Sequence, residues 1–438
     1  MKYFLSIFLV LAASFLATAN AQTVTQLDNL VMADIDAAVL AEMSQSNLPG
    51  VNIAVIYNGR VAYTKAYGLA SPGNNATTST KYPIASISKT ITGVLAMKLV
   101  ENHDLALNDL VRNYVAGYTG STITIRHLLC HQSGIGHYDD CPGGYNGAFN
   151  AISSLGVVNG CSRCMTPPGS GTIYSTFGSI LLGVIIDKVG KDVYNKSYTQ
   201  LYNDWIKAPG GLTNLTAEHD NAITNLATGY SENGGAISGY WNDIGWKLPA
   251  GGFVSTAHDL AKFGVGVMNY TFINSTTSDT MWKKQSTTGT PTNNCATALE
   301  NPYALAFASS GSASTLTLSH SGLNDNGYSS LMYLYPHVKS GIVFLTNRAQ
   351  KTGALYDLIS TLGTKVKCPT NREFTSPINW GGDWIYEGAT IKASSAFTST
   401  GAFVLDGGTE VILQPGFHAA AGTNFRAVND GCQGTINP

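Results

Sequence analysis

Two side chains between Tyr82 and Thr90 have the types and the spacing to carry out chemistry. Ser86 and Lys89 form a Ser-x-x-Lys pair directly before a run of apolar residues at helical spacing. Residues three apart on a helix share a face, so the Lys89 amine can reach the Ser86 hydroxyl if the helix begins near Ser86. Burial lowers the pKa of a lysine, which can then accept the serine proton. The structural alternative is a helix cap followed by a surface lysine.

Two further polar motifs follow in the chain. Tyr174-Ser175-Thr176 precedes the apolar helix predicted for residues 179–189, and His320-Ser321-Gly322 ends a predicted strand. A nucleophilic serine needs a base, a charge-stabilising pocket and an acid that returns the proton. A tyrosine before a helix or a His-x-Gly alone would indicate packing or a turn. The three motifs together favour a catalytic interpretation.

In this order the motifs resemble those of the serine β-lactamase and penicillin-binding protein superfamily. The class C branch is the most similar, and it includes D-alanyl-D-alanine carboxypeptidases, D-aminopeptidases and family VIII esterases. The resemblance extends from about Asp28 to Leu362, and three scaffold phrases support it: Ile123–Leu129 with Ser133-Gly134, Leu181–Ile186, and Pro249–Gly252. It implies a covalent acyl-enzyme mechanism that requires neither a metal nor an organic cofactor.

The resemblance also implies roles for single residues. Ser86 would be the nucleophile, Lys89 its proton acceptor, and Tyr174 the residue that accepts and returns the proton. His320 would supply positive or hydrogen-bonding character, and Gly322 would let the substrate approach the strand. The backbone N–H groups of Ser86 and Leu323 would form the oxyanion hole.

One position departs from the family pattern. The family has Tyr-x-Asn where this chain has Thr176, which offers a substrate amide a shorter hydroxyl instead of a donor and an acceptor. We therefore expect Thr176, as a substrate-binding residue, to favour ester or peptide hydrolysis over β-lactam recognition.

The elements that must position these motifs indicate an α+β fold. Strand 51–57, an Asn58-Gly59 turn and strand 60–67 lie near the start, and a hairpin of strands 328–335 and 341–346 lies near the end. Strands at both ends of a helix-rich middle predict one antiparallel sheet, flanked by helices and an all-helical lobe. Helices are predicted at 23–43, after Ser86, near 122–130, and at 179–189, 257–267 and 354–362, with a long loop at 138–171.

The chain divides into three predicted parts: a signal peptide at 1–21, a hydrolase domain at 22–368 and a small β domain at 369–438. The last part has short strands such as 402–405 and 411–413. It resembles the coat-hanger stacks appended to some exported bacterial proteins. Trp380 and Trp384 would permit contact with a glycan or the cell surface.

Export is predicted from the N-terminus, where Lys2, the apolar run 4–16 and the Ala19-Asn20-Ala21 cleavage site form a signal peptide. We expect a periplasmic or secreted protein without a transmembrane segment. Seven cysteines fit an oxidising compartment. Cys161 and Cys164 are expected in a local disulfide staple, and Cys368 is expected to pair with Cys432.

Other functional classes are disfavoured. A net charge of −2 gives no basis for nucleic-acid binding. His127, His131 and His137 with Cys130 and Cys141 could suggest zinc, but no glutamate follows His127 as in the metalloprotease motif. Gly-x-Ser-x-Gly, the α/β-hydrolase motif, is not found. Lys351-Thr352-Gly353 spells a family motif but follows the last hairpin instead of preceding it.

The sequence thus predicts an exported serine hydrolase that acts on an amide, ester or β-lactam bond, with a small molecule or a peptidoglycan-type peptide as substrate. The alternative from another class is a catalytically idle penicillin-recognising or surface-binding protein that retains the scaffold.

Overall fold

The computed structural model describes residues 29–118, 122–141, 149–162, 164, 167–217, 223–231, 235–236, 245–285, 303–312, 315–324 and 326–349, and then 372–374, 378–380, 384–394, 396–399, 402–419 and 424–428. The helices are α1 Asn29–Gln45, α2 Ser88–Glu101, α3 Ile125–Leu129, α4 Ala151–Asn159, α5 Thr176–Val189, α6 Tyr198–Tyr202, α7 Leu248–Gly251, α8 Ala257–Met268 and α9 Ser275–Trp282. Single turns include η1 Ala85–Ile87, η3 Tyr138–Asp140 and η6 Gly245–Lys247. Within these residues, none of the helices has the length and apolar character needed to span a bilayer.

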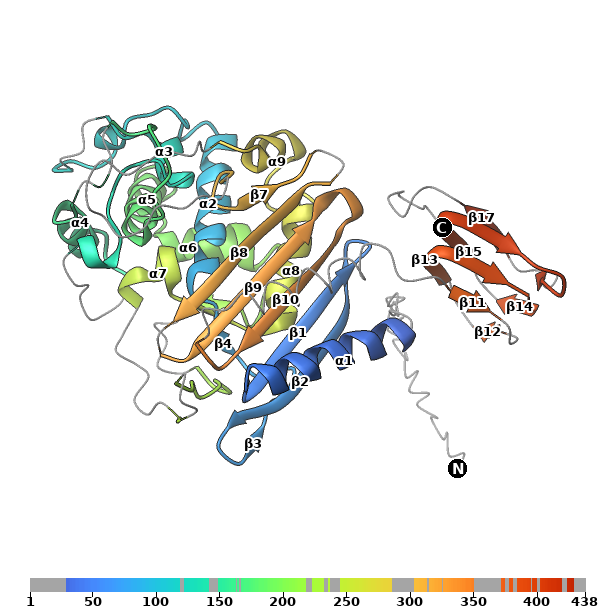
Figure 1. The fold of residues 1–438 in the computed structure, drawn as a ribbon. Coiled ribbons are helices and arrows are strands. Elements are labelled where there is room, and N and C mark those ends of the chain that lie inside the picture. Colours follow the sequence, from blue (N-terminus) through green and yellow to red (C-terminus); the bar gives the residue numbers. More distant parts are fainter. Residues whose placement is uncertain are drawn as a thin grey trace, which may run out of the picture.

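The strands of the first part are β1 Gly50–Tyr57, β2 Arg60–Ser71, β3 Asn74–Asn75, β4 Tyr82–Pro83, β5 Thr216–Ala217, β6 Phe253–Ser255, β7 Ala308–Ser310, β8 Thr317–Asn324, β9 Tyr328–Tyr335 and β10 Ser340–Thr346. Seven of them form one sheet in the order β3-β2-β1-β10-β9-β8-β7, and its named pairings are antiparallel (Figure 1). β1 pairs with β10 from Val51↔Thr346 to Ile56↔Gly341. This pairing confirms that the first and last strands of the domain share one sheet.

Helices cover both faces of this sheet. β1 is buried along its whole length, and its side chains alternate between two cores. Ile53 and Val55 pack with Ile35 of α1 in one core. Ile56 on the opposite face belongs to the larger core, which includes Phe263 of α8. Figure 1 shows α1 crossing the front of the sheet and α8 behind it.

α2 joins the sheet to the helical lobe, where it packs against α5, α7 and α9. Gly93 permits this packing, because a Cβ there would lie 2.2 Å from the Cβ of Ala306. The Thr92 hydroxyl donates to the Pro249 carbonyl oxygen at 2.5 Å and so fixes α7 beside α2. The N-terminus of α2 is therefore held at the junction of sheet and lobe.

The predicted loop at 138–171 is wrong in part, because it contains α4. The Asn150 side chain caps this helix by accepting from the N–H groups of Ile152 and Ser153. Val158 is fully buried, and α4 packs against α5. Glycine and serine within α4 lower its intrinsic helix propensity, so tertiary packing decides this element.

The predicted end of a strand at Gly322 is also wrong. β8 runs through Gly322 to Asn324, and the reversal into β9 contains Gly327 at φ +96°. The other bounds differ little: α1 ends at Gln45, and α5 begins at Thr176, capped by Ser175. The helix predicted at 354–362 and the Lys351-Thr352-Gly353 motif lie outside the described residues, as does the signal peptide.

The C-terminal part has parallel strands: β11 Arg372–Phe374, β12 Ile378–Trp380, β13 Trp384–Ala393, β14 Ala396–Ser399, β15 Ala402–Leu413, β16 His418–Ala419 and β17 Asn424–Val428. They form two sheets, β11-β13-β15-β17 and β12-β14-β16. Trp384 pairs with Phe403 and Phe403 with Phe425, so equivalent positions recur after 19 and 22 residues. Residues 402–413 form one strand, not the two short ones predicted. Cys368 and Cys432 lie outside the described residues.

Candidate active site

Ser86 lies in η1, the single turn that leads into α2. The preceding residue, Ala85, has φ +45°, a conformation that costs a non-glycine residue about 1 kcal/mol. Hydrogen bonds hold this turn: Ser330 Oγ donates to the Ile84 carbonyl at 2.8 Å, and Ser88 Oγ donates to the Ala85 carbonyl at 2.6 Å. The sheet and α2 thus fix a strained turn directly before the candidate nucleophile.

Lys89 extends from the first turn of α2 and is 2% exposed. Its Nζ lies 2.9 Å from Ser86 Oγ, 3.2 Å from Thr176 Oγ1 and 2.8 Å from the Ala250 carbonyl oxygen. Within the described residues it forms no ion pair with a carboxylate. The structure therefore brings together the two residues of the Ser-x-x-Lys pair.

Burial, with a smaller effect of the Lys247 charge, holds the pKa of Lys89 well below its usual value. A neutral amine has two N–H donors and one lone pair. The carbonyl of Ala250 and the hydroxyl of Thr176 can accept from the two donors, which leaves the lone pair for the Ser86 hydroxyl. The contacts of Lys89 thus fit its neutral form.

Tyr174 lies directly before α5, with its ring centroid 4.8 Å from Lys89 Nζ. Other rings surround it, at centroid distances of 4.5 Å for His131, 5.4 Å for His137, 6.2 Å for His320 and 6.3 Å for Tyr303. The predicted residues Ser86, Lys89, Tyr174, Thr176 and His320 therefore share one cluster.

Two histidines that sequence reasoning weighed only as zinc ligands hold the turn before α5. His131 Nδ1 accepts from the Ser175 backbone N–H at 3.3 Å, and His137 Nδ1 accepts from that of Thr176 at 3.2 Å. These bonds fix the backbone of Ser175 and Thr176, the two residues that follow the tyrosine of the motif. Tyr303 and the Ala250 carbonyl were also missed, since their contacts with the cluster span long stretches of sequence.

His320 is 4% exposed and neutral, because burial is the main cause that lowers its pKa to about 3. The Ser321 carbonyl oxygen lies 2.7 Å from Nδ1, so Nδ1 carries the proton and donates it. Nε2 is then an acceptor, and it has no partner within the described residues. His320 thus offers hydrogen bonding instead of positive charge.

Gly322 is required by the protein's own packing. A Cβ at Gly322 would lie 2.3 Å from the Ile84 carbonyl oxygen and 2.4 Å from Ser330 Oγ. The glycine therefore lets β8 approach the Ser86 turn, which is a different reason from the substrate access inferred from the sequence. Leu323 follows with a partly exposed side chain. β7 pairs with β8 only as far as Ser319, so no described strand pairs with that edge of β8 beyond it.

We expect His137 to make the protein sensitive to acid. Burial is the main cause that lowers its pKa to about 4, and the charge of Lys247 acts in the same direction. As the pH falls from about 6.5 to 4, the unfolded chain binds a proton that the folded chain does not, so the free energy of unfolding falls, by at most about 3 kcal/mol.

Urea denaturation from pH 7.5 to 4 tests this expectation. His137→Asn keeps an acceptor for the Thr176 N–H but does not titrate, so its stability should depend less on pH. His103→Asn, at an exposed position, should behave like the unchanged protein. Equal pH slopes in the two variants would contradict this role of His137.

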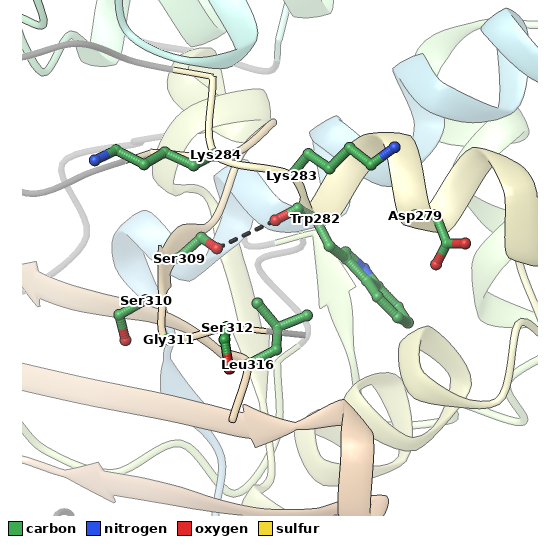
Figure 2. Close-up of a pocket in the computed structure, with 9 residues that line it drawn as sticks. All are labelled: Asp279, Trp282, Lys283, Lys284, Ser309, Ser310, Gly311, Ser312 and Leu316. Carbon is green, nitrogen blue, oxygen red and sulfur yellow. Dashed lines mark hydrogen bonds between the residues drawn. The ribbon is translucent and has the colours of Figure 1, made fainter. Parts of the chain in front are cut away.

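A separate cavity of about 590 Å³ lies between the end of α9 and the β7–β8 turn, and none of the predicted site residues lines it. Figure 2 shows Lys283 and Lys284 pointing away from each other. The Ser309 hydroxyl is occupied by the Trp282 carbonyl oxygen, to which it donates at 3.1 Å. The side chains of this cavity do not converge on one ligand position.

Among known proteins, the family model described as "Beta-lactamase" matches residues 35–361. Protein flp of Staphylococcus aureus strain COL is 29% identical over 349 residues, which cover 74% of this chain and 64% of that protein. Beta-lactamase-like protein 4 of Dictyostelium discoideum is 26% identical over 294 residues, covering 60% of this chain and 51% of that protein. The chain thus spans less than two thirds of the length of these relatives.

Solved structures show the same fold. The octameric penicillin-binding protein homologue from Pyrococcus abyssi superposes with a TM-score of 0.63 at 22% identity, over 76% of this chain and 77% of that one. SurE gives a TM-score of 0.62 at 20% identity, over 78% and 77%. Since the family model covers most of the chain and the fold agrees, the chain belongs to the beta-lactamase family, within the serine β-lactamase and transpeptidase superfamily.

Proposed function

We propose that this protein is a serine hydrolase that cleaves amide, ester or β-lactam bonds through a covalent acyl-enzyme. One observation carries the proposal. The Lys89 amine is buried, lies 2.9 Å from the Ser86 hydroxyl and has no carboxylate partner among the described residues. A neutral amine in this position can accept the serine proton.

In the proposed reaction, Ser86 Oγ forms a bond to the substrate carbonyl carbon while its proton passes to Lys89. The oxyanion is stabilised by the N–H groups of Ser86 and Leu323. Tyr174, which lies against Lys89, passes the proton to the leaving group as the carbonyl–leaving-group bond breaks. Water then attacks the acyl carbon, the bond between this carbon and Ser86 Oγ breaks, the acid leaves, and a proton from the water restores the serine hydroxyl.

Thr176 is proposed to set the choice of substrate. Its side chain is buried, and its hydroxyl contacts Lys89 where the family has an asparagine amide. An ester needs no side-chain amide of the protein for its recognition. The amide of a β-lactam substrate, in contrast, loses the donor and the acceptor that an asparagine at position 176 would offer.

We expect Thr176→Asn to raise the rate of β-lactam acylation relative to ester hydrolysis. The measurement compares a chromogenic cephalosporin with a short p-nitrophenyl ester in the unchanged protein and the variant. Thr176→Val is the matched control, because it removes the hydroxyl from Lys89 without adding an amide. Faster turnover of the cephalosporin than of the ester by the unchanged protein would contradict the proposed preference.

The alternative is a binding protein that keeps the scaffold without catalysis. A fluorescent serine-reactive probe separates the two, since only a working site becomes labelled. A panel of a D-Ala-D-Ala peptide, a p-nitrophenyl ester and a cephalosporin then identifies the substrate class. Absence of labelling and of turnover on all three substrates would favour the binding protein.

We further propose that the protein is exported to the periplasm or the extracellular space. Support comes from the predicted signal peptide and from the disulfide between Cys141 and Cys161, since disulfides persist in oxidising compartments. This bond joins η3 to the end of α4 and thereby supports the segment that carries His137. Contact with a glycan or the cell surface through residues 369–438 stays a prediction from the sequence.

A further inference from the structure

A single lysine at the site has a charge that the proposed chemistry does not use. Lys247 ends η6, directly before α7, and is partly buried. Its ammonium lies 5.7 Å from the centroid of the Tyr138 ring, a cation–π contact. Within the described residues it forms no ion pair. The carboxylate of Asp140, in the same turn as Tyr138, accepts instead from the His137 backbone N–H at 3.4 Å.

The packing of Gly251 places this lysine next to the candidate nucleophile. A Cβ built on Gly251 would lie 3.7 Å from both Cδ and Cε of Lys247 and 3.9 Å from the carbonyl carbon of Ala85. The aliphatic part of Lys247 therefore runs beside the residue that precedes Ser86. The charge also reaches the cluster, since it contributes to the lowered pKa values of Lys89 and His137.

The rings below Lys247 connect it to the reacting groups. Tyr138 is 47% exposed and its ring lies 4.4 Å from that of His137, which in turn lies 5.4 Å from that of Tyr174. Burial disfavours the charged forms of Lys89 and His320, and Lys247 is the lysine whose ammonium lies over Tyr138, at the exposed end of this aromatic row. A partly buried ammonium that has no counter-ion among the described residues is suited to bind an anion.

We propose that Lys247 binds a carboxylate of the substrate and so makes the hydrolase selective for anionic esters and peptides. His320 on β8 would then supply only a hydrogen bond to the substrate, and Lys247 would recognise the charge of the substrate. This assignment rests on the proposed hydrolase function. Lys247 would act as a specificity-determining residue, since none of the proposed bond-breaking steps uses it.

The test compares two p-nitrophenyl esters of equal length, one derived from glutaric acid with a free carboxylate and one from pentanoic acid with a methyl group. The ratio of their kcat/KM values measures charge recognition. Lys247→Met should lower this ratio by about tenfold, and Lys247→Arg should restore most of it. Any change in the Lys89 pKa affects both esters alike and cancels in the ratio. The control is Lys283→Met, which changes an exposed lysine at the cavity between α9 and the β7–β8 turn and should leave the ratio unchanged.

Binding provides a readout that does not depend on turnover. Calorimetry on Ser86→Ala should show tighter binding of the anionic ester than of the neutral one, and addition of Lys247→Met should remove the difference. An unchanged ratio in Lys247→Met together with equal binding of the two esters would overturn the proposal. Hydrolysis by Ser86→Ala at the full rate would overturn the proposed mechanism instead, while the binding comparison would still test Lys247.

Discussion

Ser86→Ala is expected to abolish covalent labelling by a serine-reactive probe and to lower ester hydrolysis on the order of 10⁴-fold or more. The substitution removes the oxygen that forms the acyl bond, and no other group of the site can replace it. The fold should persist, because the Ser86 side chain is partly exposed and, within the described residues, its hydroxyl is hydrogen-bonded to the side chain of Lys89.

Two measurements check this result. Mass spectrometry of the labelled protein should locate the adduct on Ser86. The matched control is Ser179→Ala, which removes a buried hydroxyl from α5 close to the motif of Tyr174 and should leave labelling intact. An adduct on another residue, or full activity in Ser86→Ala, would show that the nucleophile is wrongly assigned.

Lys89→Ala is expected to lower the acylation rate by roughly 10²-fold or more, since no other described side chain is placed to accept the Ser86 proton. Lys89→Met should have the same effect while filling more of the buried space. Lys98→Met, at the other end of α2 and paired with Glu101, is the control and should keep full activity.

Lys89→Met should lower the activity of the protein but not its stability. In the folded protein burial lowers the pKa of Lys89, so the unfolded chain holds the Lys89 proton more tightly than the folded chain does, which costs stability below the unfolded pKa. Lys89→Met removes this cost and should unfold at an equal or higher temperature. A loss of activity with retained stability separates catalysis from misfolding. Full activity in Lys89→Met would show that another group is the base.

The Ser-x-x-Lys pair shows which contacts a local sequence pattern can predict. The three-residue spacing was enough to predict that Lys89 meets Ser86, because both residues lie within one helical turn. Asn58-Gly59 likewise predicted the β1–β2 hairpin, since both residues adopt the positive φ angles that a tight turn requires. The burial of β1 and β10 along their whole length followed from apolar runs of strand length.

The order of the motifs predicted the family, but not what each residue does in the site. Gly322 has a packing role that the sequence did not predict, because the Ile84 carbonyl that excludes a side chain lies on a different element. α4 was missed because its cap and its packing against α5 offset a weak helix propensity. The role of His137 depended on a bond to Thr176, 39 residues away.

The sequence by itself determined which groups could react, since spacing within one turn or one hairpin is a local property of the backbone. The tertiary structure decided the protonation state in which these groups react. Lys89 has a lowered pKa because the sheet and the lobe close over it and because the Ala250 carbonyl, 161 residues away, accepts one of its protons. Lys247 lies near the Ser86 turn because η6 and α7 pack beside that turn, where Gly251 has Lys247 and Ala85 as neighbours. Burial and long-range contacts of this kind depend on packing the whole chain, which no local pattern encodes.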